Sequence, residues 1–197
     1  MANVQAQFGF AQFGYLPGGA PDYQLSKYAI QSSYATAIYF GDPVVKSAAS
    51  GYIQPATGTG SLTAISGIFQ GCVYTPKGGV PGWLPWYPPT AAGADSTAYV
   101  IDSPLALFKV AALLTAVPPS AIGEGIGYST GAGGTTLGGG FSTFTVDQSL
   151  LTTGAVAPFQ VYSMYPGVGN GSDTTTNYNW VIVAFNAQRF KQLTTIA

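Results

Sequence analysis

Short runs of β-branched and aromatic residues recur along this chain from Lys27 onward, and each run ends at glycine, proline, aspartate or serine. Runs of this length and composition are typical of β-strands joined by turns. The 27 glycines and 14 prolines among 197 residues supply the breaks between them. We therefore predict an all-β fold, an antiparallel β-barrel or β-sandwich with long loops rich in glycine and proline. The clearest predicted strands are residues 33–40, 67–75, 97–101, 141–146, 159–165 and 179–186.

Three other segments refine this prediction. Residues 180–185 are apolar on both faces, which indicates a central strand covered on both sides. Residues 102–117 form the one plausible helix, with Ser103 as a cap and Pro104 in the first turn, although we favour a strand there. Residues 123–140 are dense in glycine, which indicates a mobile loop or a backbone that closely approaches a neighbour.

The first 26 residues carry a short tandem repeat of aromatic residues. Phe8 and Phe10 are followed by Phe13 and Tyr15, each pair being separated by one glycine. Aromatic residues at this spacing lie on the same side of an extended backbone. We predict an extended N-terminal arm over residues 1–26, followed by a single β-rich domain over residues 27–197. The arm needs a surface to lie on, either its own domain or another subunit.

The chain lacks most of the side chains that enzymes use. It has no histidine, so the usual hydrolase triads and the commonest metal ligand are missing, and its few carboxylates form no recognisable motif. We expect no enzymatic activity and no cofactor, with a carboxylate-pair hydrolase as a remote alternative. Six Lys and Arg residues, scattered along the chain, do not predict nucleic-acid binding. No apolar stretch predicts a membrane span, and Cys72 is expected to be a small buried residue.

The densest aromatic loop contains Trp83, Trp86 and Tyr87 among three prolines. Such residues pack internally, anchor protein interfaces or stack on sugar rings. All three interpretations stay open from the sequence.

Several short segments follow one another in a characteristic order. They are MAN (1–3), FGF (8–10), YFGDPV (39–44), GIFQGCVY (67–74), AYVIDSP (98–104), LF (107–108), IG (122–123) and VIVAFN (181–186). In this order the chain resembles the small capsid decoration, or cement, proteins of tailed bacteriophages. The resemblance implies a trimeric module on the outside of a virion capsid, bound to the major capsid protein. We expect synthesis in the host cytoplasm.

From these observations we expect a virion structural protein that cements adjacent capsid subunits, and we expect a homotrimer. The predicted contact residues toward the capsid or a neighbouring subunit are Phe8, Phe10, Phe13, Tyr15, Trp83, Trp86 and Tyr87. The alternatives are a phage tail, neck or fibre component, or a carbohydrate-binding β-sandwich that uses the aromatic loop. Because charges are few and histidine is absent, attachment is expected to depend only weakly on salt and on mildly acidic pH.

Overall fold

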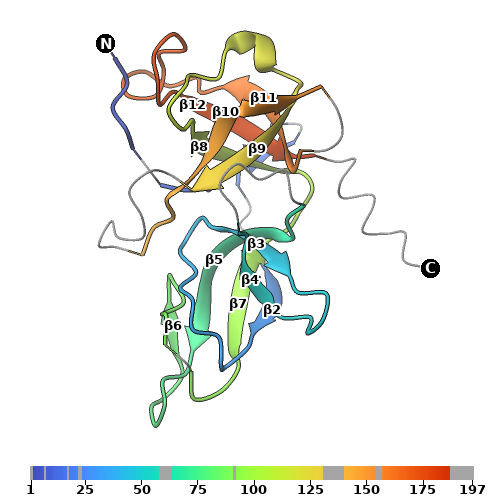
Figure 1. Ribbon diagram of the computed structural model, residues 1–197, viewed down its shortest axis with the longest axis vertical. Coiled ribbons are helices and arrows are strands. Elements are labelled where there is room, and N and C mark those ends of the chain that lie inside the picture. Colours follow the sequence, from blue (N-terminus) through green and yellow to red (C-terminus); the bar gives the residue numbers. More distant parts are fainter. Residues whose placement is uncertain are drawn as a thin grey trace, which may run out of the picture.

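The computed structural model describes residues 2–6, 8–16, 18–21, 24–57, 64–90, 92–130, 140–153 and 157–186. Within these residues the protein is all-β, with two antiparallel sheets and one short 3₁₀ helix, η1 (Pro119–Ala121). One sheet lies above the other along the long axis of the molecule (Figure 1). Neither sheet closes into a barrel, so the all-β prediction is confirmed and its sandwich form, rather than its barrel form, agrees with the structure.

Sheet A occupies the upper half of Figure 1 and has the strand order β1-β8-β12-β11-β9-β10. Its strands are β1 (Ala11–Tyr15), β8 (Ala106–Ala111), β9 (Gly125–Thr130), β10 (Phe144–Thr152), β11 (Phe159–Met164) and β12 (Trp180–Phe185). The predicted central strand is confirmed, because β12 lies between β8 and β11 and all its side chains after Trp180 are buried.

Sheet B occupies the lower half of Figure 1 and has the strand order β2-β7-β5-β3-β4, with β6 paired to the far end of β5. Its strands are β2 (Ser26–Ile30), β3 (Pro43–Lys46), β4 (Ile53–Pro55), β5 (Gly67–Tyr74), β6 (Gly82–Leu84) and β7 (Ser96–Ile101). The β5–β6 hairpin forms the lower tip of the molecule in Figure 1.

Three predictions differ from the observed elements: the strand at residues 33–40, the strand at 141–146, which is observed as β10 (Phe144–Thr152), and the glycine-dense loop at 123–140, part of which is β9. The predicted strand at residues 33–40 is wrong: a turn is closed by the Tyr34 N–H on the Gln31 carbonyl, and Ile38 and Phe40 form only isolated bridges. Over residues 102–117 the favoured strand is present as β8, without a helix. Phe108 and Val110 lie in the core and Lys109 lies on the opposite face, which is the alternation expected of a strand. In the glycine-dense segment, Gly125–Thr130 is the strand β9, and residues 131–139 lie outside the described residues.

Two main core clusters stabilise the two sheets. The larger cluster lies on sheet A and also includes Ile68 and Ile101 of sheet B, so the two sheets share a core where they meet. The second cluster lies on the inner face of sheet B and includes Cys72, which is fully buried as predicted. Burial raises the pKa of the Cys72 thiol to about 12.

The two sheets are also joined by backbone hydrogen bonds at one junction. The Phe10 N–H donates to the Gly41 carbonyl (3.0 Å), and the Ser142 N–H donates to the Phe40 carbonyl (2.9 Å). Gly9 has a φ of 66°, and a Cβ at this position would overlap Ser142, so the close approach requires glycine. The junction therefore connects the N-terminal segment, the turn at Gly41 and the segment before β10.

Candidate interaction surfaces

The beginning of the predicted arm is held by the loop between β11 and β12. The Asn3 side-chain oxygen accepts from the Gly171 N–H (2.9 Å), and its amide nitrogen donates to the Asp173 carbonyl (2.7 Å). Val4 and Asn170 exchange two further bonds, at 2.6 and 3.0 Å. Of the two surfaces considered for the arm, this segment thus lies on its own chain.

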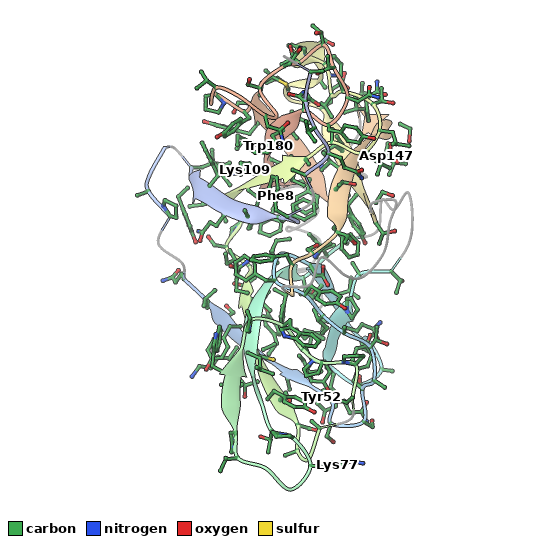
Figure 2. All side chains as sticks on the ribbon, turned by 90° about the vertical axis from the view of Figure 1, so that its left-hand side faces the viewer. Phe8, Tyr52, Lys77, Lys109, Asp147 and Trp180 are labelled. Atoms are coloured by element: carbon green, nitrogen blue, oxygen red, sulfur yellow. The ribbon has the colours of Figure 1, made fainter. Side chains whose placement is uncertain are left out.

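An aromatic cluster around Lys109 holds the next part of the arm. The Lys109 Nζ lies 4.6 Å from the ring centre of Trp180, 4.9 Å from Phe8 and 5.5 Å from Tyr165. Figure 2 shows Phe8, Lys109 and Trp180 together on the sheet A half. Ring faces attract a cation through their quadrupole. The charge of Lys109 therefore interacts with aromatic rings of its own chain, and Phe8 of the arm supplies one of these rings.

The remaining aromatic residues of the arm have three different environments. Phe10 is fully buried and stacks on Phe159 at 4.5 Å between ring centres. Phe13 is exposed at a bulge of β1, and Tyr15 packs half-buried against the larger core. Because β1 pairs with β8, the end of the arm is an edge strand of sheet A. Phe10 thus offers no surface to a partner in this structure, and Phe13 offers the most.

The three residues of the aromatic loop do not form one surface. Tyr87 is fully buried in the core of sheet B and donates its hydroxyl to the Tyr34 carbonyl (3.0 Å). Trp86 is half-buried and stacks on Tyr39 at 5.9 Å. Trp83 alone is exposed, on β6. A sugar platform built from all three is therefore not assembled, because the chain turns Tyr87 inward to fill the core.

Two contact residues, one aromatic and one cationic, were not predicted from the sequence. Tyr99 on β7 lies 5.2 Å from Trp83 between ring centres, and the Lys27 Nζ lies 5.9 Å from the Tyr99 ring. The alternation in β7 places Tyr99 on the opposite face from the buried Ala98 and Val100. The sequence carried that alternation, but the neighbouring strands became evident only from the sheet order.

Asp42 is the one strongly perturbed carboxyl group in the described part of the chain. It is 3% exposed, and its Oδ2 accepts from the Tyr39 N–H (2.8 Å), while Oδ1 has no hydrogen-bond partner. Burial raises the Asp42 pKa to about 7, against a smaller lowering by the Tyr39 N–H and the Ser142 hydroxyl. Although the chain lacks histidine, it has a group that titrates near neutral pH.

Most of the exposed large apolar side chains in the described part of the chain belong to strands of sheet A or to the segments next to them. We call this group the sheet A apolar set, and it comprises Val4, Phe13, Leu105, Leu114, Ile122, Phe141, Tyr162 and Val168. Beside sheet B the corresponding residues in the described part of the chain are Leu25, Val80 and Trp83.

The described residues contain no cluster of three or more His, Cys, Asp or Glu side chains that could hold a metal ion. Among the same residues, no helix is both long and apolar enough to cross a membrane. Comparison with protein-family models, with curated proteins and with solved structures found no match.

Proposed function

We propose that this protein is a virion structural component that decorates the outer surface of a tailed-phage capsid and cements adjacent subunits of the major capsid protein. The order of segments resembling capsid decoration proteins supports this proposal, as does an all-β architecture with few charges. The observation that carries it is the sheet A apolar set, which lies on the same half as the docked N-terminal segment.

Charge is sparse around these apolar residues. The described carboxylates in or beside sheet A strands are Glu124, Asp147 and Asp173, and the one described cation there, Lys109, is engaged by three rings. A partner that covers this half therefore removes water from few charged side chains, so the desolvation cost of binding is small. Each apolar contact is small, but a shell presents many equivalent sites, so modest contacts add up when the protein binds as a multimer such as the expected trimer.

The docked N-terminal segment changes how attachment works in this proposal. An arm that orders only on assembly loses conformational entropy at that step, and this cost weakens binding. Here Asn3, Phe8 and Phe10 already have partners in their own chain. The segment therefore presents a preformed surface to the capsid, including the exposed side chain of Val4.

Co-sedimentation with empty shells of the phage's major capsid protein tests the proposal. We expect the wild-type protein to pellet with the shells, and Val168→Asp, in the sheet A apolar set, to bind more weakly because it places a charge in the contact. Val80→Asp is the matched control, since Val80 is also highly exposed but lies beside sheet B. Absence of any co-sedimentation contradicts the proposed function, and equal loss in both variants contradicts the proposed surface.

Cryo-electron microscopy of the source virion distinguishes the capsid from other sites of attachment. We expect density for this chain on the capsid exterior near local threefold positions, as a trimer. Density confined to the tail, neck or fibres contradicts capsid decoration and supports the alternative structural role.

A further inference from the structure

The outer face of sheet B places an aromatic pair and a cation in one row across four strands. The register pairs Lys27 of β2 with Tyr99 of β7, and Tyr99 with Gly71 of β5. Trp83 of β6 lies beside the same end of β5, opposite Val73. The alternate residues of these strands fill the core of sheet B, so this row lies on the other face.

Gly71 fixes the orientation of the indole ring. A Cβ at Gly71 would lie 2.5 Å from Cζ2 of Trp83, so the ring packs directly on the backbone of β5. Tyr99 supports it from the side, with 60° between the ring planes. Trp83 nevertheless remains 54% exposed. The result is an indole held against a rigid sheet with much of its surface open to solvent.

Lys27 is the one charged side chain of this row. The side chains that project from the same face beside Lys27, Tyr99 and Trp83 are small or neutral: Ala29, Val73 and Thr97. In the described part of the chain Lys27 has no carboxylate within ion-pair distance. Asp95 and Asp102, which flank β7, accept hydrogen bonds from Tyr52 and from Ser26 and Tyr28, and Asp42, which precedes β3, is buried.

We infer that this row, Trp83, Tyr99 and Lys27, binds a short oligosaccharide that carries carboxylate groups. The apolar C–H face of one sugar ring stacks on Trp83, and the carboxylate of a neighbouring unit pairs with Lys27 beyond Tyr99. The single cation suits a ligand with about one negative charge per contact, whereas single-stranded nucleic acid requires a groove of several cations. Two rings are also too small an area for a stable protein interface, which buries roughly 800 Å² per partner.

This inference is independent of the proposed function, because it concerns sheet B and the proposed capsid contact concerns sheet A. Shell binding and saccharide binding can therefore fail separately. A protein attached through sheet A would leave sheet B and its row free for a ligand outside the shell.

Titration calorimetry and NMR with defined oligosaccharides test the inference. The probes are carboxylated tetramers of galacturonate, of mannuronate and of sialic acid, each compared with its methyl ester, which keeps the sugar rings but removes the charge. We expect at least one acid tetramer to bind, and its ester to bind up to about fivefold more weakly, the size of an exposed ion pair.

Four variants assign the contacts. Trp83→Ala should weaken binding of both acid and ester about tenfold, through the lost stacking. Lys27→Gln should weaken binding of the acid alone, to the level of the ester. Tyr162→Ala and Lys77→Gln are the controls, an exposed aromatic residue on sheet A and an exposed cation in the β5–β6 loop, and should bind like wild type.

Three outcomes overturn the inference. These are no binding of any acid tetramer at millimolar concentration, equal affinity for acid and ester, and wild-type affinity in Trp83→Ala. Self-association of the protein that Trp83→Ala abolishes, without saccharide binding, would instead assign this face to a second copy of the chain.

Discussion

The buried carboxyl group of Asp42 makes the stability of this protein depend on pH in an unusual direction. Its pKa is raised from 3.8 to about 7 in the folded protein, so the folded state holds the proton more tightly than the unfolded state. The free energy of unfolding must then fall as pH rises from about 4 to about 7. Most carboxyl groups act in the opposite direction, because pairing lowers their pKa and stability is lost on acidification.

The magnitude follows from the size of the shift. Roughly three pKa units correspond to about 4 kcal/mol between pH 4 and pH 8, with a slope of at most about 1.4 kcal/mol per pH unit. No ionised partner counteracts the rise in the Asp42 pKa. The groups that lower this pKa are the neutral Tyr39 N–H and the Ser142 side chain. Ionised Asp42 is thus a buried charge with one short hydrogen bond.

Urea unfolding followed by tryptophan fluorescence, from pH 4.5 to pH 8.5, measures this effect. We expect wild-type stability to fall over this range, and Asp42→Asn to show no such fall and to be the more stable protein at pH 8. Asp95→Asn is the control, because hydrogen bonds lower the pKa of this exposed group and its contribution is lost only below about pH 4. Wild-type stability that rises toward pH 7, or an unchanged slope in Asp42→Asn, would mean that Asp42 does not hold its proton more tightly in the folded state.

Three further predictions follow from the contacts. Phe10→Ala should lower the free energy of unfolding by about 3–5 kcal/mol, whereas exposed Phe13→Ala should cost under about 1 kcal/mol; equal small losses in urea melts would mean that the arm is not docked. Asn3→Ala should speed hydrogen exchange at the Gly171 amide, measured by NMR, with unchanged exchange contradicting the docking. Cys72 should resist Ellman's reagent at pH 8 until denaturant is added, and rapid reaction of the native protein would contradict its burial.

The strands that sequence reasoning located best are those with the strongest local signal. Residues 180–185 are apolar throughout, and 67–75 and 97–101 combine β-branched and aromatic residues, so β12, β5 and β7 lie close to their predicted bounds. Residues 33–40 carry a similar composition without forming a ladder. The backbone there bridges to Tyr87 and Phe141 at single residues, which no local pattern indicates.

The candidate contact residues were harder to place than the strands. Phe8 and Phe13 have equivalent places in the tandem repeat, yet Phe8 packs against Trp180 and Lys109 whereas Phe13 is exposed. Phe13 lies at the bulge in β1 between Gln12 and Gly14, and no local pattern in the sequence indicates that bulge. Nothing in the sequence indicates that Asp42 is buried, because its burial results from the meeting of the two sheets.

Three properties follow from the amino-acid sequence alone: the chain forms strands, its surface carries few charges, and it has no histidine. These properties depend on composition and on the alternation of side chains along a strand, and both can be read from neighbouring residues. Tertiary structure alone decided that Tyr87 is inside and Trp83 outside, and that Lys27, Tyr99 and Trp83 form one row. The physical reason is that a strand's alternation defines two faces, whereas strand order, register and the opposing layer decide which face is covered.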